Sequence, residues 1–225
     1  MKRVIAIDGP SGSGKSTVAR AIAAVLGFDV LDTGAMYRAA TLTALRHGIA
    51  LDDGDAVVAL VREVRIAADA GVVTLDGDDV SDEIRTPVVT SAVSSVAALP
   101  EVREELVGRQ RAWLDRKGSG VVEGRDIGTV VFPDAAVKVY LTASEAERAR
   151  RRQADESAAR RLTTLDEEQH RLVERDRRDS TRATSPLARA DDALTIDSTD
   201  LSVDEIVEMV LARWHQRSAP GEDGR

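Results

Sequence analysis

The sequence predicts an α/β fold in which a central parallel sheet is flanked by helices. Hydrophobic residues make up 43% of the 225 residues but aromatic residues only 3%. Ala, Val, Leu and Ile must therefore build the core, as is usual for a parallel sheet covered on both faces. An early apolar run, "VIAI", is followed by a glycine-rich turn and then by a segment with helical periodicity. The length suits one compact unit that carries an insertion.

The first part of the chain alternates between predicted strands and helices. Residues 3–8 form a buried strand and residues 17–27 a helix that ends at a glycine. A second short strand is predicted at 28–33, and a second helix at 34–48 again ends at a glycine. This order of elements is typical of a parallel sheet built from strand–helix units.

From residue 51 the pattern changes. A helix is predicted over 55–64, and short alternating segments follow over 72–80, where Asp76 and Gly77 form a hairpin signal. We therefore expect an insertion at about 51–93 with a small sheet of its own.

The remaining segments return to the first pattern and end in a polar tail. They are predicted as a helix at about 100–116, core strands at 120–126 and 136–141, a long arginine-rich helical region, a strand at 192–197, a helix at 202–217 and a disordered tail at 218–225. No internal repeat is present.

Composition excludes several classes of site. The chain has no cysteine, which excludes disulfides, thiolate metal sites and a cysteine nucleophile. His47, His170 and His215 do not lie at metal-ligand spacing from one another. No apolar run of about 18 residues predicts a membrane span or a secretory signal. We expect a cytoplasmic protein without membrane partners.

The net charge of −8 argues against nucleic acid as a partner. Basic residues gather at 148–182, but acidic residues are interleaved and aromatic residues are lacking. A solvated helix face is the alternative interpretation for any single arginine in this region.

The stretch "GPSGSGKST", Gly9 to Thr17, matches the pattern G-x-x-x-x-G-K-[ST] between a predicted strand and a predicted helix. Glycines let consecutive backbone N–H groups converge on phosphate oxygens at a helix N-terminus. We expect Lys15 to reach the β- and γ-phosphates of a nucleoside triphosphate and the Ser16 hydroxyl to bind Mg²⁺. The residues expected to bind the triphosphate are Gly9, Pro10, Ser11, Gly12, Ser13, Gly14, Lys15, Ser16 and Thr17.

Several protein classes use this loop, and the rest of the sequence discriminates between them. The other lysines are Lys2, Lys117 and Lys138, and none is followed two residues later by aspartate, as an N-K-x-D element of a GTPase requires. The chain is too short for the extra modules of a large ATPase. A small-molecule kinase remains, and it needs a second pocket that neutralises its acceptor.

Three further stretches carry a family resemblance: "LDTGAMYR" at 31–38, "GRDIGTVVFPDA" at 124–135 and "ERDRRDSTRATSPL" at 174–187. Together they resemble the bacterial cytidylate kinases, with similarity from about Ile5 to Met209 that includes "DGDDVSDEIRTPVV". The resemblance implies a monomeric enzyme with the P-loop NTPase fold that transfers the γ-phosphoryl group of ATP to CMP or dCMP with Mg²⁺. It also implies one kinase domain with a core at about 1–50, 90–147 and 183–217, a monophosphate-binding insertion, and a lid at about 148–182.

The same resemblance implies roles for individual residues. The acceptor phosphate would be held by Thr33, Tyr37, Arg38, Arg125 and Arg182, cytosine would be read by Ser94, Arg103 and Asp126, the sugar would be bound by Asp179, and the ATP phosphates would be clamped by Arg148 and Arg152. Lys15, Arg125 and Arg182 would be catalytic.

These residue types suit the chemistry. Guanidinium groups bind a phosphate dianion bidentately and stay charged at any working pH. Cytosine presents an amine donor beside two acceptors, which an aspartate and an arginine match. Uracil would place an acceptor opposite Asp126, a costly mismatch in a buried site.

Most assignments have a structural alternative. Arg38 could be an exposed partner of Asp32, and Arg103 could pair with neighbouring glutamates on its helix. Tyr37 could belong to the core. Ser94 could serve only a helix start, with Ser91 and Ser95 as competitors for its role.

Three more side chains have open or structural roles. Glu123 could hold a water ligand of Mg²⁺ but is left out of the catalytic set, and Trp113 and Trp214 are expected to pack. Two rival functions also remain: a kinase for UMP, AMP or a sugar acid, and a binding protein that uses ATP as a switch.

Overall fold

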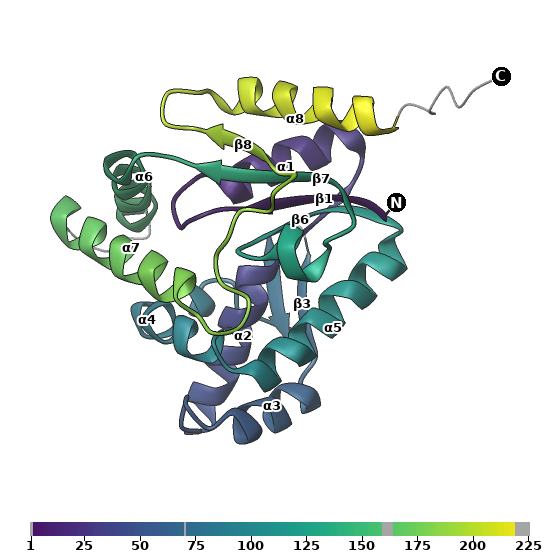
Figure 1. Ribbon diagram of the computed structural model, residues 1–225. Helices are drawn as coiled ribbons and strands as arrows, with labels where there is room; N and C mark the ends of the chain where they lie inside the picture. The colour runs from purple at the N-terminus through teal and green to yellow at the C-terminus, as the bar shows by residue number, and fades with distance from the viewer. Residues whose placement is uncertain (1, 70, 159–163, 219–225) are drawn as a thin grey trace.

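The computed structural model describes residues 2–69, 71–158 and 164–218, and within them the strands form one eight-stranded sheet (Figure 1). Its order is β5-β4-β3-β2-β6-β1-β7-β8. The strands are β1 (Lys2–Asp8), β2 (Asp29–Asp32), β3 (Ile66–Asp69), β4 (Val72–Leu75), β5 (Asp78–Asp79), β6 (Ser119–Gly124), β7 (Ala135–Thr142) and β8 (Leu194–Asp197). The neighbouring pairs β2–β6, β6–β1, β1–β7 and β7–β8 are parallel, which confirms the predicted α/β class.

Helices cover both faces of this sheet (Figure 1). They are α1 (Lys15–Leu26), α2 (Thr33–Arg46), α3 (Gly54–Glu63), η1 (Glu83–Arg85), α4 (Pro87–Val96), α5 (Pro100–Lys117), η2 (Ile127–Val131), α6 (Glu145–Ala158), α7 (Leu165–Ser180) and α8 (Val203–Ser218). Helices α1 and α8 pack on one face, and α2 and α5 on the other.

Strand β1 shows how the two faces divide the core. Its side chains alternate: Val4 and Ala6 join the cluster with α2, α3 and α5, whereas Ile5 and Ile7 join the cluster with α1 and α8. All four are fully buried. A strand covered on both faces reads as a continuous apolar run, as the sequence does here.

The insertion contains the predicted helix and hairpin. Asp76 and Gly77 have φ angles of 53° and 102°, which a tight β4–β5 turn requires and which Asp and Gly tolerate. The small antiparallel ribbon β3–β5 joins the main sheet at a single pairing, Leu31 with Asp69. Helix α4 was not predicted as a helix, because its Val, Thr and Ser residues have weak helix propensity.

The arginine-rich region forms two helices, α6 and α7, which pack against each other. Residues 159–163 between them lie outside the described residues, as do 219–225, on which most of the predicted disordered tail falls. In the described ranges, no helix combines the length and the apolar character needed to cross a membrane.

Both tryptophans pack as expected. Trp214 packs edge-on against Phe28 at a centroid distance of 5.4 Å, and Trp113 is buried beneath β6.

Two glycines give a paired test of this packing. In β6, a Cβ on Gly120 would lie 2.8 Å from two ring atoms of the buried Trp113. We predict that Gly120→Ala lowers the free energy of unfolding by about 1–3 kcal/mol through overpacking. Gly108 lies on the exposed side of α5, and a Cβ there meets nothing within 4 Å. Gly108→Ala should therefore raise the free energy of unfolding by about 0.5–1 kcal/mol. Urea unfolding of both variants measures the two effects, and shifts of the same sign would contradict the packing described.

Candidate active site

The glycine-rich loop between β1 and α1 lies at the carboxyl edge of the parallel strands, where α/β folds bind ligands. A Cβ on Gly9 would lie 2.0 Å from the Leu141 carbonyl oxygen, so only glycine lets the loop pass β7. The Nζ of Lys15 donates to the Pro10 carbonyl at 2.7 Å. Burial, together with the nearby Arg125, lowers the pKa of Lys15 to about 7. The nearby Glu123 and Asp176 carboxylates oppose this shift only in part.

A cavity of about 670 Å³ opens beside this loop. Of the predicted triphosphate-binding residues, its lining includes Ser11, Gly12, Gly14, Lys15, Ser16, Thr17 and Arg152, while Gly9, Pro10 and Ser13 are buried behind it. Glu123, at the end of β6, also lines the cavity, and its side chain hydrogen-bonds with Ser16. Burial, with Asp32 nearby, raises the pKa of Glu123 to about 7.

A second cavity, of about 60 Å³, adjoins the first. All residues expected to bind the acceptor line it except Arg38: they are Thr33, Tyr37, Ser94, Arg103, Arg125, Asp126, Asp179 and Arg182. Arg38 lines the larger cavity instead. It is buried and donates to the Ile84 carbonyl at 3.1 Å and to the Thr90 hydroxyl at 2.8 Å, so the alternative of an exposed partner of Asp32 is wrong.

Arg103 and Asp126 form a buried ion pair on one wall of the small cavity. Arg103 also donates to the Ala97 carbonyl at 3.1 Å, and its guanidinium carbon lies 5.4 Å from the centre of the Tyr37 ring. The alternative of a helix-surface pair with glutamates is therefore wrong for Arg103. Tyr37 belongs to the core cluster and also lines the cavity, and its contact with the acceptor phosphate stays a prediction.

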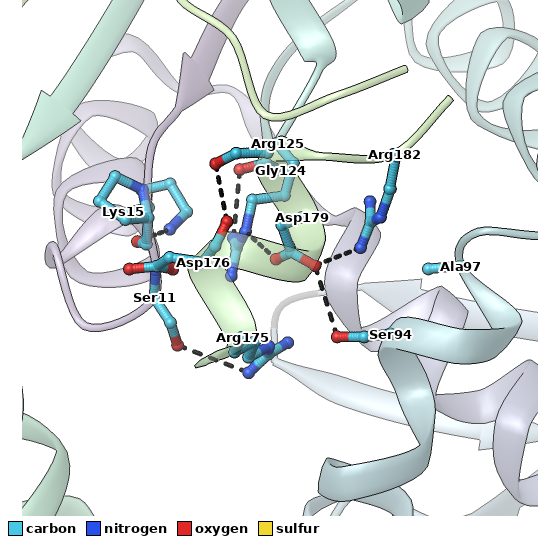
Figure 2. Close-up of polar contacts among 12 residues, drawn as sticks. Ser11, Lys15, Ser94, Ala97, Gly124, Arg125, Arg175, Asp176, Asp179 and Arg182 are labelled. Carbon is cyan, nitrogen blue, oxygen red and sulfur yellow. Dashed lines mark hydrogen bonds and ion pairs between the residues drawn. The ribbon is translucent and has the colours of Figure 1, made fainter. Parts of the chain in front are cut away.

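Asp179 connects three elements at the opposite wall (Figure 2). Its carboxylate accepts from Arg125 Nε at 2.9 Å, pairs with Arg182, and accepts from the Ser94 hydroxyl at 3.4 Å. Burial alone would raise the pKa of Asp179, but the adjacent Arg125 and Arg182 lower it below its usual value. Ser94 is buried in the second half of α4, whereas Ser91 and Ser95 are exposed, so Ser94 is the serine that faces the cavity.

The lid arginines differ from one another. Arg148 donates to the Ser11 carbonyl at 3.1 Å and pairs with Asp176, whose other carboxylate oxygen accepts from the Ser11 amide at 3.2 Å. Arg148 is therefore bound to the backbone of the glycine-rich loop and to α7. Arg152 lines the large cavity and lies 3.8 Å from Glu168.

Arg175 and Asp176 were not assigned from the sequence. Arg175 lines both cavities and lies 3.5 Å from the Ser11 hydroxyl (Figure 2). Burial and the nearby Arg125 lower its pKa to about 10. Helical spacing could have found it, because Arg175 precedes Asp179 by four residues in the predicted helical region and shares its face.

Several donors in this site lack acceptors. Within residues 2–69, 71–158 and 164–218, the buried Nε atoms of Arg103, Arg175 and Arg182 have no hydrogen-bond partner. A buried unsatisfied donor costs about 1–3 kcal/mol. The site is therefore suited to a ligand that brings hydrogen-bond acceptors, such as phosphate oxygens.

Comparison with known proteins points to one family. The model of the family described as cytidylate kinase matches residues 5–216. The cytidylate kinase of Pelotomaculum thermopropionicum is 53% identical over 219 residues, which cover 93% of this chain and 94% of that protein. A bifunctional pantoate ligase/cytidylate kinase of a Synechococcus strain is 48% identical over 227 residues, 96% of this chain, which spans 42% of that longer protein.

Solved structures support the fold. Shikimate kinase from Acinetobacter baumannii, in complex with shikimate, has a TM-score of 0.50 and 16% identity, with 97% of this chain and 96% of that chain covered. At this identity the likeness concerns the fold alone, which is that of the P-loop kinases.

The Asp179 cluster yields a stability prediction. Asp179→Asn should lower the free energy of unfolding at pH 7 by about 3–5 kcal/mol, because it leaves two buried guanidinium groups without their carboxylate. The lowered pKa means that this stabilisation is present above the ordinary value of 3.8 and is lost as the pH falls through the folded-state pKa. The difference between wild type and variant, measured by urea unfolding, should therefore shrink in acid. A difference that stayed constant down to pH 3 would contradict it.

Proposed function

The chain belongs to the cytidylate kinase family, and from this premise we propose that it transfers the γ-phosphoryl group of ATP to CMP or dCMP, giving ADP and CDP or dCDP. One observation carries the proposal: the cavity beside the glycine-rich loop and the small cavity share Lys15, Arg125 and Arg175. A donor in one cavity and an acceptor in the other would bring their phosphates together at these three cations.

The donor side fits ATP with Mg²⁺. The loop supplies backbone amides and Lys15 for the phosphates, and the Ser16 hydroxyl with the Glu123 carboxylate offers the sparse oxygen set that Mg²⁺ prefers beside substrate phosphates. In the described part of the chain, no group of three or more His, Cys, Asp or Glu could hold a metal on its own. When bound, Mg²⁺ would neutralise the phosphate charge, with Ser16 as a direct ligand and Glu123 holding a ligand water.

The acceptor side fits a cytidine monophosphate. We assign its phosphate to Thr33, Tyr37, Arg38, Arg125 and Arg182, its base to Ser94, Arg103 and Asp126, and its sugar to Asp179. The unpaired Nε of Arg103 lies beside Asp126, so the pair offers both a donor and an acceptor to a cytosine edge. Arg175 joins Arg125 at the junction of the two cavities.

The chemistry then asks little of the protein beyond position and charge. The attacking group is already a phosphate oxyanion, so no general base is needed. Lys15, Arg125 and Arg175 neutralise the charge that spreads over the transferred group. Arg148 holds the glycine-rich loop through the Ser11 carbonyl, and Arg152 lines the donor cavity. Both stay in the proposal as partners of the ATP phosphates.

The small cavity is well below the roughly 300–1,000 Å³ of typical ligand pockets, and its walls include α4 residues from the insertion side and α7 residues from the lid. We therefore include in the proposal an insertion and a lid that separate to admit the acceptor and close to exclude water. The proposal also includes a monomer located in the cytoplasm.

A coupled ADP-release assay with ATP, Mg²⁺ and a panel of nucleoside monophosphates tests the function. CMP and dCMP should be the preferred acceptors. Preference for UMP, AMP or a sugar acid would contradict the proposed acceptor, and ATP turnover that needs no monophosphate would favour the rival nucleotide switch.

Lys15 tests the donor site. Lys15→Ala should lower turnover about 100-fold or more, because it removes a preorganised charge at the transferred group. Lys117→Ala is the matched control, since Lys117 makes only a partly exposed pair with Asp29 at 3.3 Å. Near-normal turnover of folded Lys15→Ala would contradict a catalytic role for this lysine.

Asp126 tests base recognition. Asp126→Asn replaces an acceptor for the cytosine amine by a group that can also donate to the uracil oxygen. The ratio of kcat/KM for CMP over UMP should fall about 10- to 100-fold, corresponding to about 1–3 kcal/mol of hydrogen-bond discrimination. Equal losses with both substrates would show that Asp126 does not read the base.

A further inference from the structure

A buried carboxylate outside both cavities holds the segment that carries Asp126. Asp8 is the last residue of β1, directly before the glycine-rich loop, and is 4% exposed. One of its carboxylate oxygens accepts from the Ile127 amide and the other from the Gly128 amide, each at 2.7 Å. It lines neither cavity. Asp8 therefore connects the strand before the phosphate-binding loop to the residues immediately after Asp126.

The held segment has an uncommon backbone. Asp126 immediately precedes η2, a π-helix in which the Phe132 amide donates to the Ile127 carbonyl at 2.7 Å. At its other end, Arg111 donates to the Val130 and Val131 carbonyls at 2.9 and 3.1 Å. A single π-helical turn is rare and is frequently found at functional sites. Asp8 and Arg111 thus fix this turn at both ends.

Asp8 provides the acceptors for two buried backbone amides. No ion pair of Asp8 is present in the described residues. Burial raises the pKa of Asp8 to about 6, even though the two amide hydrogen bonds lower it. An ionised group in this position therefore costs free energy of folding.

We propose that Asp8 is a positioning residue for base recognition: through the Ile127 and Gly128 amides it sets Asp126 relative to the phosphate-binding loop. This inference rests on the proposed function. Asp8 lines neither cavity, so we expect its effect to reach the base through Asp126. Loss of the carboxylate should loosen base selection and leave ATP binding largely intact.

The test compares D8N with D192N. In D8N the carboxamide keeps the shape but turns its NH₂ group toward one of the two amides. The ratio of kcat/KM for CMP over UMP should fall about 10-fold, while the KM for ATP stays within about 2-fold. Asp192 pairs at the surface with Lys138, whose side chain packs beside Gly128, so D192N disturbs the same neighbourhood without touching Asp8. Its ratio should match that of wild type.

A double-mutant cycle identifies the route. In the D126N background, D8N should leave the ratio of kcat/KM for CMP over UMP unchanged, because Asp126, the residue through which Asp8 acts, is already substituted. An unchanged ratio in D8N alone, or an equal further drop in D126N, overturns the inference. If D8N does not fold, D8S, which removes the carboxylate without adding an amide donor, takes its place in the cycle. A wild-type enzyme with no preference for CMP overturns the proposed function as well, whereas a preference that D8N leaves intact overturns this inference alone.

Discussion

The site depends on the pairing of buried guanidinium groups with a small number of carboxylates. Asp126 pairs with Arg103, Asp176 with Arg148, and Asp179 with both Arg125 and Arg182. Unpaired cations in such surroundings would repel one another and lose hydration. Each aspartate also connects separate elements: Asp179 alone joins α7 to the end of β6 and to α4. The same contacts that keep the arginines in place therefore hold α7 and α4 against the end of β6.

The sheet explains why these groups meet. Strands β2, β6 and β1 run parallel, so their carboxyl ends lie together and place Asp32, Glu123 and Asp8 at one edge. The residues that follow these strands are Thr33 at the start of α2, Arg125 and the glycine-rich turn. Cations from α6 and α7 then approach from outside the sheet. The sheet thus positions the glycine-rich loop, and α6 and α7 supply the cations Arg152 and Arg175 that line the cavity beside it.

Sequence reasoning recovered what local patterns encode. The loop from Gly9 to Thr17, the strand–helix order and the hairpin at Asp76 and Gly77 follow from short-range rules of glycine geometry and periodicity. The acceptor residues came from a family resemblance, and the structure gathers them around one cavity except for Arg38. Contacts that join distant segments could not be found in this way, because no local rule pairs Asp8 with Gly128 or Ser11 with Asp176, which are 120 and 165 residues apart. Helix α4 was missed because tertiary packing outweighs its weak propensity.

The contact of Asp176 with the glycine-rich loop affects the free energy with which an anion can bind to that loop. The loop amide of Ser11 has an anionic acceptor within the protein, and Arg148 has a counter-ion. A phosphate that takes either partner must replace an existing charge-assisted bond, so its binding free energy is that of an exchange rather than of a simple addition. Such an exchange is nearly neutral for an ion that makes one contact and favourable for one that makes many at once. The internal carboxylate thereby competes with any anion that approaches the Ser11 amide or Arg148.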